Sequence, residues 1–168
     1  MLSLMDAALF LLSPKELDDL TQHPFEWLDI QQRMHTQSSL YLGHAWQSYH
    51  EVLNRYSAEP IPVLNYVIQA EHALKTNLNL PEALRYNSIS KVSSIYQALY
   101  LIEVSELKRR YQHYLRDQAT QLRETDELSL GEFRLLYRDL VELYRIACLN
   151  NQLLCSIIRH SIPPQPLV

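Results

Sequence analysis

The sequence contains very little glycine. Only Gly43 and Gly131 occur in 168 residues, whereas an average chain has about 7% glycine. Tight hairpin turns and phosphate-cradling loops depend on glycine because it adopts positive φ without steric cost. The shortage argues against folds built on such turns and loops, and it favours a helical chain.

Cysteine and long apolar runs are also scarce. Cys148 and Cys155 match no zinc or redox motif, so we expect both to be small buried hydrophobes in a reducing compartment. No stretch approaches the roughly 20 apolar residues that span a membrane. The first residues carry no Lys or Arg ahead of their apolar run and no small-residue cleavage site after it. We therefore predict a cytoplasmic protein with no membrane contact.

Excess positive charge is absent as well. There are 15 Lys and Arg against 19 Asp and Glu, a net charge of -4. This balance gives no general attraction to nucleic acid. The segment "LKRRYQHYLR" interleaves basic and aromatic residues, as in single-strand binders, but "RETDE" follows shortly after it. We interpret the basic segment as a solvated helix face and predict no nucleic-acid partner.

The hydrophobic content of 47% is enough for one real core. Ser13 and Glu16 form a capping box ahead of a helix, as do Ser129 and Glu132. "HPFEWLDI" predicts a short helical piece, and "TNLNLPEALRYNS" a loop. The sequence predicts strands at 7–12 and 152–158. It predicts helices at 14–21, 39–56, 61–75 and 89–100. Two further helices are predicted, one that Ser105 caps and one from Ser129 to Asn150.

The two predicted strands lie at opposite ends of the chain, and each needs a hydrogen-bonded neighbour. We therefore expect them to be adjacent in one small sheet covered by helices. No repeat or linker divides the chain. The prediction is a helix-dominated α+β fold with a single domain over 1–160 and a Pro-rich tail over 161–168.

Four segments resemble a known family: "YLGHAWQSYHEVLN", "YVIQAEHAL", "LRYNSISKVSSIYQAL" and "LYRIACLNNQLLCSIIRH". In this order they are similar to the YfbM-like family of bacterial proteins, a domain of unknown function. The resemblance covers about Ala7 to His160 and implies a compact α+β fold with no assigned activity. Arg55 and Ala70 stand about where the family tends to have glycine, so a close backbone approach is expected to be lost there. The positions that match the family are Trp46, His50, Glu71, Arg85 and Tyr86.

Trp46 and His50 are spaced four residues apart on an apolar helical stripe. We expect this face to pack inside the domain, so that Trp46→Ala costs about 3–5 kcal/mol. His50 is then a core histidine with bonded nitrogens. The alternatives are a pocket residue that exchanges protons and, least favoured, a metal ligand. No HExxH or His-x-His pair supports a metal site.

Arg85 and Tyr86 precede a predicted helix start. One interpretation is an anion site formed by the guanidinium and the free N–H groups of the helix. The other is a buried salt bridge from Arg85 to Glu82 or, as first choice, Glu71. A buried bridge would couple Arg85 and Glu71 in a double-mutant cycle.

No catalytic motif is present, and we predict neither a cofactor nor a metal site. Eleven tyrosines are the most unusual positive feature, and tyrosine is favoured both in cores and at interfaces. The leading hypothesis is a non-enzymatic protein-interaction module, in its narrower form an immunity protein that neutralises a basic toxin. The alternative is a protein or enzyme that binds an anionic small molecule in a cleft built on His50, Glu71 and Arg85.

Overall fold

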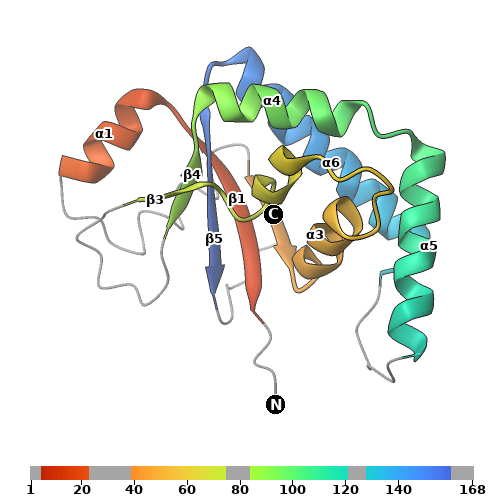
Figure 1. Ribbon diagram of the computed structural model, residues 1–168. Coiled ribbons are helices and arrows are strands. Elements are labelled where there is room, and N and C mark those ends of the chain that lie inside the picture. Colours follow the sequence, from red (N-terminus) through yellow and green to blue (C-terminus); the bar gives the residue numbers. More distant parts are fainter. Residues whose placement is uncertain (1–4, 23–38, 75–83, 121–127, 160–168) are drawn as a thin grey trace.

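A computed structural model describes residues 5–22, 39–74, 84–120 and 128–159. The predicted helical piece at "HPFEWLDI", the "RETDE" connector and the Pro-rich tail lie outside these residues. Within them the protein is a helix-dominated α+β domain with one antiparallel sheet, as predicted (Figure 1). The strand order is β2-β1-β5-β4-β3.

The two terminal strands form the centre of the sheet. β1 (Asp6–Leu12) pairs antiparallel with β5 (Leu153–Arg159) over seven residue pairs, from Asp6–Arg159 to Leu12–Leu153. Both are nearly continuous apolar runs because both of their faces are buried. The prediction that the chain ends are neighbours in one sheet is confirmed.

Helices cover the sheet on both faces (Figure 1). Alternate residues of β1 separate the two cores: Leu9 and Leu11 face the larger one, and Ala8 and Phe10 the smaller. The smaller core is closed by Leu20 of α1 (Pro14–Gln22). The larger core is filled from α3 (Trp46–Asn54), α4 (Ile89–Tyr100), α5 (Val104–Thr120) and α6 (Leu130–Leu149).

Helix ends are fixed by the local chemistry that the sequence predicts. Ser129 and Glu132 form a complete capping box at α6, and Ser13 and Glu16 form the same pair of bonds before α1. Asn150 ends α6, and Asn151 follows with φ 49°, a conformation that asparagine tolerates. Ser105 is not a cap, because α5 already begins at Val104.

The predicted helix at 39–56 is wrong in its first part. β2 (Ser39–Gly43) occupies that part and pairs antiparallel with β1, with a register shift between Ala7 and Ala8. β1 has a row of backbone groups free on this side, and β2 satisfies them. Gly43 turns the chain out of the strand with φ +52°, and the helix then starts at Trp46.

The predicted helix at 61–75 is also wrong. A short 3-10 helix, η1 (Pro62–Tyr66), is followed by the two-residue strand β3 (His72–Ala73). The predicted loop at 76–88 is wrong in its last part. Residues Arg85–Asn87 form the strand β4, which pairs with both β3 and β5. The secondary structure of these segments is determined by backbone pairing with strands that are distant in the sequence.

Candidate functional site

Arg85 lies on β4 and binds the main chain. Its Nε donates to the carbonyl of Ala70 at 2.5 Å, and its Nη2 donates to the carbonyl of Glu71 at 2.7 Å. The predicted salt bridge to the Glu71 carboxylate is therefore wrong: Arg85 contacts the right residue through its backbone. The guanidinium connects the segment before β3 to β4 of the sheet.

The Glu71 carboxylate has other partners. Oε1 lies 3.2 Å from Lys91 Nζ, and Oε2 lies 3.3 Å from His72 Nε2. Lys91 Nζ also lies 4.8 Å from the centre of the Tyr66 ring. These half-exposed groups form a surface network around the edge of the sheet.

Two buried polar side chains extend these contacts from the edge towards the centre of the sheet. Asn87 is fully buried; it accepts from the Glu71 N–H at 2.9 Å and donates to the Tyr66 carbonyl at 2.7 Å. Ser156 of β5 accepts from the Ala70 N–H at 3.1 Å. We call Ala70, Glu71, Arg85, Asn87 and Ser156 the edge cluster. The side chains of Arg85, Asn87 and Ser156 bind backbone groups of Ala70 and Glu71 that β-pairing leaves free, which is a structural task.

Trp46 and His50 lie on α3, half-buried. Trp46 Nε1 donates to the carbonyl of Met5 at 2.8 Å, and the two rings lie 6.5 Å apart between centroids. The face of α3 that packs fully into the core carries Tyr49, Val52 and Leu53 instead. Within the described part of the chain, the ring nitrogens of His50 make no hydrogen bond, and burial lowers the pKa of its imidazole. His50 is therefore not the fully bonded core histidine that the sequence predicts.

The predicted site residues form two groups rather than one. Tyr86 pairs with His72 across the two strands, with the rings 5.2 Å apart, so Tyr86 belongs with Arg85 and Glu71. Trp46 and His50 follow β2, at the opposite edge of the sheet from β3. Across the ranges that the structure describes, no hydrogen bond, ion pair or ring contact joins His50 to Glu71 or Arg85.

A group of three polar side chains near β2 was not identified from the sequence. His44 Nδ1 lies 2.7 Å from Oδ1 of the buried Asp6, and the Tyr41 hydroxyl donates to Asp6 Oδ2 at 3.0 Å. Burial and the Asp6 carboxylate raise the pKa of Tyr41. These contacts fasten the start of β1 to the end of β2.

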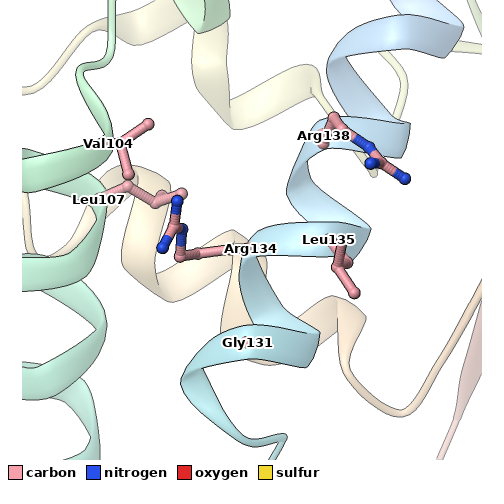
Figure 2. A pocket seen from close by; sticks show the side chains of 6 residues that line it. All are labelled: Val104, Leu107, Gly131, Arg134, Leu135 and Arg138. Atoms are coloured by element: carbon pink, nitrogen blue, oxygen red, sulfur yellow. The ribbon is translucent and has the colours of Figure 1, made fainter.

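A hollow lies between α5 and α6 (Figure 2). It encloses about 510 Å³, and we call it the α5–α6 groove. Arg134 extends from α6 towards Leu107 of α5. A side chain added at Gly131 would meet only the Ser129 hydroxyl, at 3.9 Å, so this wall is open. The groove is lined by Val104, Leu107, Gly131, Arg134, Leu135 and Arg138.

The groove exposes apolar side chains that a core would bury. Val104 is 56% exposed and Leu135 is 54% exposed, and Tyr100 and Leu101, which precede Val104 in the chain, are also exposed. Within the described ranges, Arg134 has no hydrogen-bond or ion-pair partner, and the only such partner of Arg138 is its neighbour Asp139, at 3.2 Å. The groove is thus apolar inside and positively charged along α6.

Sequence reasoning missed this groove for a simple reason. It followed the inward stripe of α6, on which Phe133, Tyr137 and Leu140 are buried. The positions 131, 134, 135 and 138 form a second stripe with helical spacing, and Leu135 stands on it between arginines. An isolated leucine on an otherwise polar helix face was the available signal.

No described group of three or more His, Cys, Asp or Glu side chains could hold a metal ion. No helix in the described ranges is long and apolar enough to cross a membrane.

Comparisons with known proteins agree with the resemblance found in the sequence. A family model described as "Domain of unknown function (DUF1877)" matches residues 5–155. A crystal structure of YfbM from Escherichia coli, a protein of unknown function, has the same fold with a TM-score of 0.59 and 16% sequence identity. The match covers 91% of this chain and 99% of that one. No curated protein matches the chain.

Proposed function

The chain belongs to the family described as a domain of unknown function (DUF1877), and from this premise we propose that it is a non-enzymatic protein-interaction module that binds through the α5–α6 groove. The observation that carries the proposal is the exposure of Val104 and Leu135 around a hollow of about 510 Å³. Contiguous exposed apolar surface with a polar rim is typical of interaction sites.

The groove selects the chemistry of its partner. Burial of Val104 and Leu135 under a partner side chain would remove apolar surface from water, and this is favourable. Arg134 has no described partner, so a carboxylate beside that side chain would gain a charge-assisted hydrogen bond. The partner segment therefore presents a large apolar residue next to Asp or Glu.

The cytoplasm is the compartment we propose for this interaction, as predicted from the sequence. Both cysteines are free thiols, Cys155 buried and Cys148 half-buried, which suits a reducing environment.

Separately from the groove, we propose the narrower role of an immunity protein that neutralises a basic toxin. Net charge -4 and small size support it. The arginines of the groove repel a basic surface, so a basic toxin would bind elsewhere on the molecule. A toxin gene next to the gene for this chain would support the role, and its absence across several genomes would count against it.

Selection from a random peptide library tests the groove. Peptides are selected on the wild-type chain and then measured on Leu135→Glu, which places a carboxylate in the groove. Leu149→Glu is the matched control, because Leu149 is also an exposed leucine of α6, 67% exposed, but does not line the groove. We expect enriched peptides that combine a large apolar residue with Asp or Glu and that lose binding only on Leu135→Glu.

Two results would contradict the proposal. One is a selection that enriches no binding peptide. The other is a set of peptides that bind Leu135→Glu and wild type equally well.

A further inference from the structure

A second hollow lies between the end of α3 and the middle of α5. It encloses about 310 Å³, near the lower end of the range for small-ligand sites. We call it the α3–α5 pocket. Its wall includes Arg55, Tyr56 and Ser57 from the turn after α3, and Arg109, His113 and Asp117 from α5.

Both arginines have hydrogen-bond donors to spare. Arg109 uses one edge, Nε and Nη2, to bind the two oxygens of Glu106 at 2.9 and 2.8 Å. Its Nη1 has no described partner. The guanidinium of Arg55 lies 3.8 Å from the nearest Glu51 oxygen, too far for a hydrogen bond. Each fork can therefore donate to an oxyanion in the pocket.

The charge near Arg109 is not fully compensated. Glu106 serves two arginines, because Arg110 Nε also donates to its Oε1 at 2.7 Å. Hydrogen bonds from Arg109 and Arg110 lower the pKa of Glu106 to about 2, so this carboxylate is ionised at neutral pH. One negative charge then faces two positive charges.

Among the described residues of the wall, Asp117 is the one carboxylate, and its two oxygens have partners. Its Oδ2 accepts a hydrogen bond from the Tyr56 hydroxyl at 2.8 Å, and its Oδ1 lies 3.9 Å from His113 Nε2. Burial and Asp117 raise the pKa of Tyr56 to about 12, so the hydroxyl keeps its proton at neutral pH. Asp117 has the same sign of charge as any anion in the pocket, so removal of its charge should strengthen anion binding.

We propose that the α3–α5 pocket binds the phosphate group of a small ligand, with Arg55 and Arg109 as the main donors and His113 beside them. Two guanidinium forks from different elements match the several oxygens of a phosphate, whereas a single carboxylate is satisfied by one fork. The site uses none of the residues predicted for an anion cleft from the sequence, and it does not depend on the α5–α6 groove.

NMR titration of the full chain tests the site. The probes are inorganic phosphate and glycerol 3-phosphate at low ionic strength, with acetate as a carboxylate of single charge. We expect saturable shifts at Arg55, Arg109 and His113 with both phosphates and much weaker shifts with acetate. Tighter binding of the ester identifies an organic phosphate as the ligand, and equal binding identifies free phosphate. Both results support the shared phosphate site.

Three variants and a control sharpen the test. Arg55→Gln and Arg109→Gln should each weaken phosphate binding about tenfold, since each removes charged hydrogen bonds. Asp117→Asn keeps an acceptor for Tyr56 and removes the like charge, so it should strengthen binding at least about twofold. Arg116→Gln, on the same helix but outside the pocket, should change it by less than about twofold.

Absence of saturable binding would overturn the proposal. So would an equal effect of Arg109→Gln and Arg116→Gln, because binding would then follow net charge alone. Peptide binding at the α5–α6 groove, measured on the same Arg109→Gln sample, separates the two sites. That activity should be unchanged whether or not phosphate binds.

Discussion

The edge cluster and the α5–α6 groove use arginine in opposite ways. Arg85 donates from Nε and Nη2 to two main-chain carbonyls, whereas Arg134 has no partner in the described ranges and lies beside exposed Leu135. A side chain that binds the main chain inside the fold stabilises the chain, and one left free beside apolar surface is available to a partner. Arg85, one of the residues most conspicuous in the sequence, therefore has a structural task. Variants in the two regions should separate stability from binding.

The largest loss of stability is expected at Asn87. Asn87→Leu removes the partner of the Glu71 N–H and of the Tyr66 carbonyl, and also the 3.4 Å contact to the Tyr144 hydroxyl. Each buried group left unbonded costs about 1–3 kcal/mol, so we expect a total near 3–5 kcal/mol. Urea denaturation measures this.

Asn65→Ala is the control for Asn87, because Asn65 is exposed and bonds only locally to Pro62. It should change the free energy of unfolding by less than about 0.5 kcal/mol. Equal losses for the two variants would show that Asn87 has no special place in the edge cluster.

Arg85→Met should cost about 2–3 kcal/mol, because two carbonyls lose their donors. Glu71→Gln should cost under about 1 kcal/mol, since it weakens only half-exposed pairs with Lys91 and His72. The two effects should add in a double-mutant cycle of denaturation measurements, because Arg85 binds the Glu71 carbonyl, which Gln keeps. Coupling above about 1 kcal/mol would restore the predicted salt bridge.

Trp46→Ala should cost about 2 kcal/mol. The sequence predicts about 3–5 kcal/mol for a fully buried ring, but Trp46 is only half-buried. Trp46→Phe keeps most of the apolar contact and loses the bond from Nε1 to the Met5 carbonyl, so about 1 kcal/mol is expected. A chemical-denaturation midpoint equal to wild type for both variants would mean that the ring contributes nothing to the fold.

Part of the fold can be predicted from the sequence. β1 and β5 could be predicted because short continuous apolar runs are typical of strands buried on both faces. α4 and α6 could be predicted from helical periodicity and, for α6, from its capping box. Local chemistry determines all four elements.

The errors fall where distant residues decide. Ser39–Gly43 becomes a strand because β1 needs a second partner, and the chain around Glu71 is fixed by Arg85, Asn87 and Ser156. The sequence indicated that Arg85 binds an acceptor, but it does not determine whether that acceptor is a main-chain carbonyl or a carboxylate. The α5–α6 groove depends on how two helices lie side by side, and no single segment encodes that.

Glu106→Gln should cost about 1 kcal/mol at pH 7, a value kept small because the side chains of Glu106 and Arg109 are 32% and 51% exposed, although Arg110 is buried. Hydrogen bonds from the two arginines lower the folded-state pKa of Glu106 from 4.5 to about 2. A depressed pKa gives stability that is complete above the unfolded value and disappears as pH falls through the folded value. The difference between wild type and variant should therefore hold above pH 4.5 and vanish near pH 2. A pH series of denaturation curves that shows a constant difference would contradict this.

The smallest effect on stability is expected at the groove itself. Leu135 is 54% exposed, so Leu135→Glu removes few apolar contacts. It should change the free energy of unfolding by less than about 0.5 kcal/mol. Leu149→Glu, at 67% exposure on the same helix, should behave alike in urea. The two variants should differ only in peptide binding, which Leu135→Glu abolishes and Leu149→Glu preserves. A loss above about 1.5 kcal/mol for Leu135→Glu would place Leu135 in the core, and the groove would then be a packing feature like the edge cluster.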